Sequence, residues 1–465
     1  MIQTFLDLPT SLSAAILCNW LDLKSVCRLD SAACEKSVRT TLLSLLQCME
    51  CVGQLYARNT LQLIWMNKRL IKSDKFVMID HFSEDECRKL LQRSGRYVQT
   101  FRQLCLVSQV ALLHLVAQYC NNVCFLRITI KEHVAENIAL IRANKNLREL
   151  SIRSCAPLLV RDISLPKLEL LKLDGFHIDD ATVVTLAKAT TRLMFLSISC
   201  ASITAGGLIE TARLCPQLRY FKAPDLPDID NTMLKLMPLW ASLEHIRLSG
   251  CQSLTDAGIN AVALHVKGLR SIKMTYSPSL TNACLQSLAK YQHHTLEIFI
   301  VRDSYYFPLT PVVLEDNKQT FNASAVAKFR EICTKLRVFE WERSFDFLDA
   351  GVAGDAIPYV TTADRVTFLT FGQVNDAVLH TIAQHCAQLQ VLNLSDVCYT
   401  ANFCSDAMFL ELAEKCRLLN TINVPNPSQR SRLRKLLSAH SRITIDVAEY
   451  CLSQHSLDFL YRKNM

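Results

Sequence analysis

The chain has 465 residues, of which 50% are hydrophobic and 20% are charged, so it can bury a large core and is not an intrinsically disordered protein. Its formal net charge of +8 gives a mild preference for acidic partners. The Lys and Arg residues lack the dense patterning that is typical of dedicated nucleic-acid binders, and nucleic acid is therefore not favoured as a partner.

The first residues, MIQTFLDLPTSLSA, contain neither the basic region nor the continuous apolar run of a signal peptide. We therefore expect a cytoplasmic location, with the nucleus as the alternative, and 20 cysteines that stay reduced. The most apolar stretch, 104–120, is interrupted by Ser108, Gln109, His114 and Gln118. Since about 20 mainly apolar residues are needed to cross a bilayer, we expect no membrane association.

Residues 1–46 form the first predicted element, a compact run of short helices. Apolar residues at helical spacing follow the Leu-Pro pair near the N-terminus. The segment resembles an F-box. In that family the Leu-Pro start and the apolar face dock onto a Skp-type adaptor, which links the protein to the cullin scaffold of a ubiquitin ligase. The resemblance implies these adaptor-facing residues: Leu8, Pro9, Ile16, Leu17, Leu21, Leu23 and Val26. From the residues alone, the same helices could instead cap the open end of a repeat array.

Residues 47–119 lack clean repeats, and we interpret them as linker helices and degenerate first repeats. They contain one C-x-x-C pair, Cys48 and Cys51, in an apolar helical stretch. Because no second pair follows at the spacing of a zinc ribbon, a core role is favoured over a metal site.

Residues 120–445 carry one recurring pattern, apolar-x-x-apolar-x-apolar, as in Leu147, Leu150 and Ile152. Eight of the eleven steps between successive first positions span 21 to 27 residues, which is the length of a leucine-rich repeat. The first positions are Val123, Leu147, Leu168, Leu193, Leu218, Leu243, Leu269, Leu296, Leu336, Val366, Leu389 and Leu419.

A second apolar pattern lies between the predicted strands. It recurs in four sets with offsets of five and nine: Ile203, Leu208 and Ala212; Leu254, Ile259 and Ala263; Leu280, Leu285 and Ala289; Val374, Leu379 and Ala383. The last two members of each set lie one helical turn apart, so each repeat is predicted to contain a strand, a turn and a helix with one apolar face. Stacked repeats would bury these faces in an α/β leucine-rich-repeat solenoid, a horseshoe with its strands on the concave side.

Several cysteines recur at fixed places in the repeats. Those three residues before a first position are Cys120, Cys215, Cys333, Cys386 and Cys416, and those eight residues after one are Cys155 and Cys251. Because cysteine is small and readily buried, all of these are predicted core positions. Together with the stretch LSGCQSLTDAGINAVA that begins at Leu248, this spacing resembles the cysteine-containing class of leucine-rich repeats.

The strand pattern also predicts the side chains of the concave face. Side chains alternate along a strand, so the third, fifth and seventh positions of each repeat point away from the core. The cations at the fifth and seventh positions are Arg153, Lys172, Lys222, Arg247, Lys273 and Arg302. Since neighbouring strands lie about 4.8 Å apart, these cations are predicted to form a stripe that binds an acidic or phosphorylated segment of a target protein. The alternative is an ordinary solvated strand face.

An insertion at 302–325 lengthens one repeat and contains Tyr305, Tyr306 and Phe307 beside two prolines. Aromatic side chains on an irregular insertion are typical of binding anchors, because they bring a large contact area with few rotatable bonds. The same side chains could instead pack back onto the solenoid.

The end of the chain, 446–465, is predicted to close the array as a C-terminal cap. A basic cluster precedes it, formed by Arg430, Arg432, Arg434 and Lys435. Because this cluster lacks interleaved aromatic residues, a solvated helix face is favoured over a nucleic-acid or lipid site.

No motif predicts catalysis, and we assign no catalytic residue, metal or cofactor. The 11 glycines form no phosphate-binding loop, and the pair His385-Cys386 falls on a predicted outer helix without a partner motif. By the F-box resemblance, we interpret the chain as the substrate-recognition subunit of a Skp-cullin-F-box ubiquitin ligase that holds its target on the concave face. The alternative is a ligase-independent scaffold that uses the same face. Neither function is enzymatic.

Overall fold

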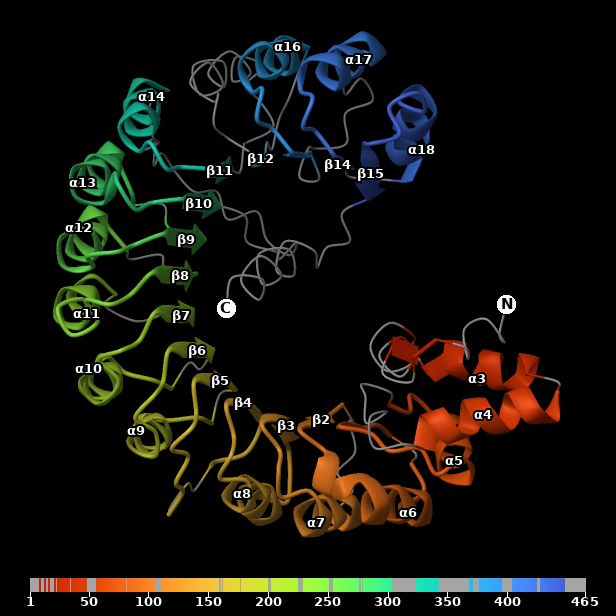
Figure 1. The fold of residues 1–465 in the computed structure, drawn as a ribbon. Helices are drawn as coiled ribbons and strands as arrows, with labels where there is room; N and C mark the ends of the chain where they lie inside the picture. The colour runs from red at the N-terminus through yellow and green to blue at the C-terminus, as the bar shows by residue number, and fades with distance from the viewer. Residues whose placement is uncertain are drawn as a thin grey trace. The chain divides into compact units, whose positions relative to one another are not determined.

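The chain divides into two compact units, Met1–Leu218 and Arg219–Met465. In both units most strands are followed by a helix (Figure 1). The computed structural model describes residues 8–9, 12–13, 16, 21, 23–33, 35–47, 56–80, 82–104, 110–158, 160, 162–175, 177–199, 202–224, 229–250, 254–275, 277, 279–302, 323–342, 368–370, 376–394, 404–424 and 427–447.

The described part of the first unit begins with helices and continues as strand-and-helix repeats. The leading helices are α3 (Leu23–Ala32), α4 (Lys36–Gln47) and α5 (Thr60–Lys68). The strands are β1 (Lys75–Met78), β2 (Thr100–Gln103), β3 (Phe125–Ile130), β4 (Glu149–Ser154), β5 (Leu170–Asp174) and β6 (Phe195–Ser199). The helices of the repeats are α6 (Glu84–Ser94), the 3₁₀ turn η3 (Gly95–Tyr97), α7 (Val110–Tyr119), α8 (Val134–Ala143), α9 (Asp180–Lys188) and α10 (Ala205–Leu214).

The second unit consists of further repeats of the same kind. Its described strands are β7 (Tyr220–Pro224), β8 (His245–Ser249), β9 (Ser271–Thr275), β10 (Ile298–Arg302), β11 (Val338–Glu342), β12 (Phe368–Thr370), β13 (Val391–Asn393), β14 (Thr421–Val424) and β15 (Thr444–Val447). Its described helices are α11 (Ile229–Leu236), α12 (Asp256–His265), α13 (Asn282–Gln292), α14 (Ala323–Ile332), α16 (Asp376–His385), α17 (Asp406–Lys415) and α18 (Pro427–Leu436).

Within each unit, every strand pairs in parallel with the next strand along the chain. All twelve predicted repeats hold a strand that begins two residues after the predicted first position. The register places equivalent core residues side by side, as in the row Leu126, Leu150, Leu171 and Leu196 of the first unit. The predicted leucine-rich-repeat solenoid fold is therefore confirmed.

Strands β1 and β2 extend the first array toward the N-terminus, into the stretch 47–119 that we interpreted as linker helices and degenerate first repeats. Phe76 of β1 and Phe101 of β2 are paired in the register, with stacked rings whose centroids lie 5.9 Å apart. At the other end of the chain, β15 spans 444–447 and so crosses the boundary placed at 445.

The core of each repeat is apolar, as the spacing predicts. The described members of the four helical sets are all buried, for example Leu208 and Ile259; Val374 lies outside the described residues. The five cysteines that precede first positions are buried as well. The prediction of a core position is wrong for Cys155, which is exposed in the turn that follows β4. Cys251 lies outside the described residues. Burying one Leu side chain contributes about 1.5–3 kcal/mol, so a stacked row contributes through many small terms.

Neighbouring helices are also joined by polar contacts at their N-termini. Asp180 at the start of α9 accepts hydrogen bonds from the backbone N–H and the hydroxyl of Thr204, which caps α10, at 2.8 and 2.5 Å. Asp256 binds Thr281, the N-cap of α13, in the same way at 2.9 and 2.5 Å. Each carboxylate satisfies a donor that the helix end leaves unpaired and carries the negative charge that a helix N-terminus favours. These contacts help to hold the repeats in register.

Candidate functional site

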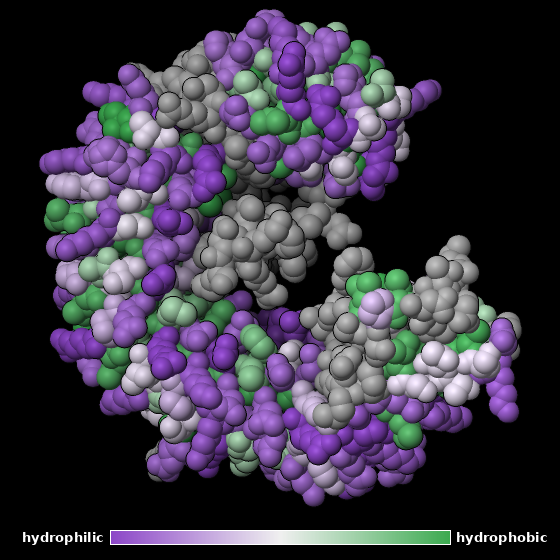
Figure 2. Space-filling model, in the orientation of Figure 1, coloured by the Kyte–Doolittle hydropathy of each residue, from purple (hydrophilic) through white to green (hydrophobic). Residues whose placement is uncertain are grey.

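The residues expected to face an adaptor are only partly exposed. Pro9 is exposed, and Leu8, Ile16 and Leu21 are half-buried. Leu17 lies outside the described residues. Figure 2 shows further hydrophobic side chains at the surface around helices α3–α5.

Leu23 and Val26 depart from the predicted role in adaptor binding. Their side chains are 4% and 0% exposed, and they are part of the protein's own core. Both lie on one face of α3, which packs against α4, where Leu42 and Leu46 are also buried. The helical spacing correctly predicted an apolar face, but that face is used within the chain and is not presented to a partner.

A buried carboxylate joins the three leading helices. Asp30 of α3 is 1% exposed and accepts hydrogen bonds from Nε of Arg39, at 2.9 Å, and from Nη2 of Arg69, at 2.9 Å. The indole Nε1 of Trp65 donates to the same carboxylate at 3.2 Å. Burial raises the pKa of Asp30, but the hydrogen bonds and charges of Arg39 and Arg69 together outweigh it and hold the pKa below its usual value.

The sequence contains one signal for this network. Asp30 lies four residues after Val26 and seven after Leu23, so it falls on the buried face of α3. An acidic residue on an apolar helix face must find partners when that face is buried. Its partners Arg39, Trp65 and Arg69 come from two other helical segments, and the spacing of residues cannot name them.

Further hydrogen bonds continue from α5 to α6, the first helix of the repeat array. The side-chain amide of Asn67 donates to a carboxylate oxygen of Glu86 at 2.7 Å and to its backbone carbonyl at 2.8 Å. Nη2 of Arg93 donates to the Asn67 side-chain oxygen at 3.1 Å and to the carbonyl of Ile71 at 3.0 Å. The hydrogen bonds from Lys89 and Asn67 hold the pKa of Glu86 below its usual value. The leading helices are thereby joined to the repeats.

We define the strand face of the first unit as the side of strands β1–β6 whose side chains point away from the apolar core of the repeats. The register places five fifth-position residues side by side on it: Arg102, Arg127, Ser151, Lys172 and Ser197. Arg127 is exposed, and Arg102 and Lys172 are half-buried. We call these three cations the cationic row. The like charges of Arg102 and Arg127 are directly opposed and repel each other, which slightly destabilises the sheet.

Two of the three members of the cationic row were not predicted from the sequence. Arg127 occupies the fifth position of the repeat that begins at Val123 and could have been read from the pattern. The repeat pattern did not identify the strand of Arg102, because Gln103 occupies a position where the pattern requires an apolar residue. Lys172 is the member that the pattern did predict.

A mixed row that contains two aromatic residues and one acid runs beside the cationic row. The third positions in register are Thr100, Phe125, Glu149, Leu170 and Phe195. Phe125 is 38% exposed, and the ammonium of Lys172 lies 5.2 Å from the centroid of the Phe195 ring. Aromatic side chains next to arginines are enriched in protein interfaces. The strand face of the first unit therefore has the composition of a protein-binding surface.

Arg153, the other predicted cation of the first unit, has its charge compensated. Its Nε lies 2.7 Å from Oδ2 of Asp174 on the neighbouring strand, and both side chains are largely exposed. An exposed pair of this kind contributes about 0.2–1 kcal/mol to stability.

In the second unit, the register brings Lys222, Arg247 and Lys273 side by side. Lys222 and Arg247 are half-buried. The prediction of an exposed cation is wrong for Lys273, because its side chain is only 5% exposed. The next residue in the register, Ile300, is buried as well. The backbone of Arg302 ends β10, but its side chain lies outside the described residues.

The third-position row of the second unit is only partly exposed, since His245, Ser271 and Ile298 are half-buried. Tyr220 is 8% exposed, and burial together with the charge of Arg270 lowers the pKa of His245 to about 4. The imidazole is therefore neutral at pH 7 and adds no positive charge to this face. The strand face of the first unit is the more accessible of the two.

Other predicted site residues lie outside the described residues. They are the insertion residues Tyr305, Tyr306 and Phe307 and the C-x-x-C pair Cys48 and Cys51. In the part of the chain that the structure describes, no group of three or more His, Cys, Asp and Glu side chains is placed to hold a metal ion. None of the described helices is long and apolar enough to span a bilayer.

The basic cluster on α18 is held by ion pairs. Arg430 lies 3.6 Å and Arg434 3.9 Å from Asp446 of β15, and Arg432 is paired with Asp406 of α17. These pairs fit the interpretation of the cluster as a solvated helix face.

Comparison with known proteins assigns no family. No protein-family model matches the chain, and no curated protein matches it. Among solved structures, the crystal structure of the Rad7 and Elc1 complex in yeast aligns with a TM-score of 0.46 at 15% identity, over 86% of this chain and 87% of that one. The TLR13-ssRNA13 complex gives a TM-score of 0.43 at 12% identity, over 80% of this chain and 52% of that one. The leucine-rich-repeat protein LegL7 from Legionella pneumophila gives 0.31 at 9% identity, over 79% and 90%. Similarity at this level does not assign a function.

Proposed function

We propose that the chain is the substrate-recognition subunit of a cullin-type ubiquitin ligase. In this role the N-terminal segment that resembles an F-box binds a Skp-type adaptor, and the strand face of the first unit binds a target protein. The chain itself performs no bond chemistry and needs no cofactor. Its contribution is proximity, because it holds a lysine of the target near the charged conjugating enzyme.

The observation that carries the proposal is the buried carboxylate of Asp30, with the hydrogen bonds that continue to α6. A receptor must hold its adaptor-binding segment in a fixed position relative to its target-binding repeats, because a loose connection would lower the effective concentration of the target at the enzyme. A fully hydrogen-bonded polar network favours one rigid arrangement.

The chemistry of the strand face supports a protein target with acidic groups. Arg102, Arg127 and Lys172 stand beside the aromatic rings of Phe125 and Phe195. Aromatic side chains and Arg dominate the binding energy of many protein interfaces, and a row of cations steers an acidic partner toward the surface.

Adaptor binding is tested by capture of the full chain on a purified Skp-type adaptor. The double variant Leu8→Asp with Ile16→Asp places charges on two half-buried apolar residues of the segment. The matched control is Leu61→Asp, since Leu61 is 77% exposed on α5, outside the segment. We expect capture of the unmodified chain and of the control, and loss of capture of the double variant. No capture of the unmodified chain, or equal capture of all three, would reject the ligase function.

Target binding is tested through proteins that co-purify with the full chain at low salt. We expect the variant Arg102→Glu with Arg127→Glu to lose them, and raising the salt to weaken their binding to the unmodified chain. The control is the outer-helix variant, Arg142→Glu with Lys188→Glu, which changes the charge equally at exposed positions on α8 and α9. Equal retention by both variants would remove the cationic row from the proposed site.

The burial of Leu23 and Val26 favours a second candidate function, a scaffold that works without a ligase. Two of the seven residues implied by the F-box resemblance are then structural, while the strand face stays available. This function predicts that the target co-purifies normally and that the adaptor is not captured at all. The two experiments above therefore separate the candidates.

A further inference from the structure

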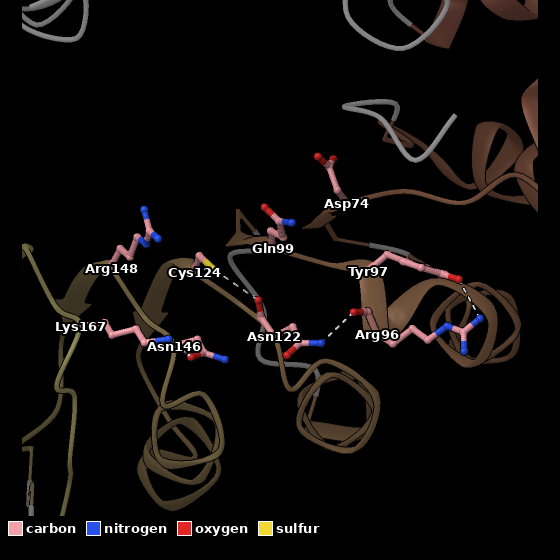
Figure 3. A pocket seen from close by; sticks show the side chains of 9 residues that line it. All are labelled: Asp74, Arg96, Tyr97, Gln99, Asn122, Cys124, Asn146, Arg148 and Lys167. Atoms are coloured by element: carbon pink, nitrogen blue, oxygen red, sulfur yellow. Dashed lines mark hydrogen bonds between the residues drawn. The ribbon is translucent and has the colours of Figure 1, made fainter. Parts of the chain in front are cut away.

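A polar pocket of about 490 Å³ lies in the first unit at the edge of the sheet where strands β1–β5 begin. Its walls come from the residues that directly precede these strands (Figure 3). We call it the edge pocket. It shares none of its lining residues with the cationic row or with the N-terminal segment.

One wall of the edge pocket is formed by the residues immediately before β1, β2, β3 and β4, which are Asp74, Gln99, Cys124 and Arg148. The backbone carbonyl of each residue accepts two N–H groups of the next repeat, as the carbonyl of Asp74 does from Gln99 at 2.7 Å and Thr100 at 3.0 Å. The backbone is thereby held in place. Figure 3 shows the side chains of Asp74, Gln99 and Arg148 projecting from this edge in a similar direction.

The second wall lies two residues earlier in each repeat and consists of Tyr97, Asn122, Asn146 and Lys167, joined by Arg96. Nη2 of Arg96 donates to the hydroxyl of Tyr97 at 2.7 Å, and Nζ of Lys167 donates to the side-chain oxygen of Asn146 at 2.8 Å. The amide of Asn122 donates to the Arg96 carbonyl at 3.0 Å. Arg96 and Lys167 are thus positioned by neutral oxygen atoms, which leave their charges uncompensated.

The edge pocket has an excess of positive charge. Arg96, Arg148 and Lys167 line it, and Asp74 is its one carboxylate. All three cations are exposed, and among the described residues none of them forms an ion pair. Glu169 continues the row of Arg148 into the next repeat, and it is not paired with Arg148 either.

The same row of positions in the second unit shows the opposite arrangement. There the residues are Arg219, Glu244, Arg270, Glu297 and Arg337, with alternating charges. Arg219 lies 3.4 Å from Glu244, Arg270 lies 3.6 Å from Glu297, and Arg337 is also paired with Glu297. The fold can therefore neutralise this edge with its own side chains. In the first unit the same row contains Asp74, Arg148 and Glu169, and among the described residues Arg148 is paired with neither acid.

We propose that the edge pocket binds an acidic peptide segment of the target protein, with carboxylate or phosphate oxygens bound by Arg96, Arg148 and Lys167. This inference rests on the proposed function for the source of the peptide. Arg148 offers the planar fork that binds either oxyacid in a bidentate manner. The amide of Gln99 is available for the backbone of the segment.

The test measures the binding of fluorescent peptides to the purified full chain in the absence of adaptor. Three peptides share one Gly-Ser backbone and carry glutamates, phosphoserines or glutamines. The pocket variant is Arg148→Glu with Lys167→Glu, and the outer-helix variant serves as the control with the same change of charge. Arg148→Gln with Lys167→Gln removes the charges without reversing them, and thermal unfolding of each variant shows that it is folded.

We expect the acidic peptides, but not the glutamine peptide, to bind the unmodified chain and the outer-helix variant equally. The pocket variant should bind them at least about tenfold more weakly, because charge-assisted hydrogen bonds are lost. Binding of both acidic peptides identifies a carboxylate as sufficient, and binding of the phosphoserine peptide alone identifies a phosphate. Unchanged binding by the pocket variant, an equal loss in the outer-helix variant, or no binding to the unmodified chain overturns the proposal.

Adaptor capture separates this inference from the proposed function. The pocket variant should be captured by the adaptor as the unmodified chain is, since the edge pocket contains no residue of the N-terminal segment. Peptide binding without adaptor capture would leave the edge pocket standing and reject the ligase function. Adaptor capture without peptide binding would support the ligase function and reject the proposed role of the edge pocket.

Discussion

The carboxylate of Asp30 and the guanidinium of Arg69 lie 2.9 Å apart, although the two residues are separated by 39 positions in the sequence. Arg69 is the C-cap of α5, so this contact joins the first described helix to the last helix before the repeats. Arg69 also lies over the ring of Trp65, with its Cζ 5.4 Å from the ring centroid. The buried carboxylate and the half-buried guanidinium and indole thus form one cluster between the leading helices.

Replacing Asp30 by Asn should lower the free energy of unfolding by about 2–3 kcal/mol. The amide keeps the shape of the side chain but leaves Arg39 and Arg69 without their anionic partner. Urea unfolding measures the loss, and hydrogen exchange should show faster opening of α3 and α5. The control is Arg88→Gln, which breaks an exposed pair with Glu84 on α6 and should change stability by less than about 0.5 kcal/mol. An equal effect of the two substitutions would refute a special role for Asp30.

The contribution of Asp30 should depend on pH in a defined direction. Its folded-state pKa lies below the ordinary value of 3.8, so the stabilisation is fully present above that value and is lost as the pH falls through the folded-state pKa. The difference in stability between the unmodified chain and Asp30→Asn should therefore be constant near neutrality and shrink below about pH 4. Urea unfolding at a series of pH values measures it. A difference that stayed constant into strong acid would contradict the lowered pKa.

Two adjacent glycines should respond differently to alanine. A Cβ atom on Gly207 would lie 2.2 Å from Oδ1 of Asp180, the carboxylate that holds Thr204 at the start of α10. Gly207→Ala should therefore reduce stability by about 1–3 kcal/mol. The neighbouring Gly206 would meet nothing closer than 3.4 Å, and Gly206→Ala should leave stability unchanged or raise it by up to about 1 kcal/mol. Thermal unfolding compares the two, and similar melting temperatures would argue against the polar contact between repeats.

Cysteines should react with iodoacetamide according to their burial. Burial raises the pKa of the Cys87 and Cys120 thiols to about 12, so little thiolate forms at mildly alkaline pH. Cys155 is exposed and should be alkylated before Cys87 and Cys120 in the folded chain. Mass spectrometry of native and urea-treated samples measures the order, and the unfolded chain provides the control because all thiols should then react. Early native modification of Cys120 would show that its repeat is open.

Predictions that rested on periodicity succeeded where one repeat contains the whole signal. The buried state of Leu208, Ala212 and Cys215 followed from their spacing, because a helix with one apolar face must bury that face. The same reasoning failed at Cys155, which follows the strand and lies in a turn whose exposure the spacing does not determine. It was incomplete at Lys273, which has the predicted register but little exposure.

The apolar pattern within each stretch of 20 to 30 residues determined where every predicted strand begins and which side chains enter the core, since a strand and a helix of one repeat are set by neighbours close in the sequence. Only the tertiary structure decided that Leu23 and Val26 pack inward, that Asp30 meets Arg69, and that Arg148 and Lys167 line one pocket. These outcomes depend on which residues stacking brings together. A contact between residues from different repeats or helices is created by packing and leaves no periodic trace in the chain.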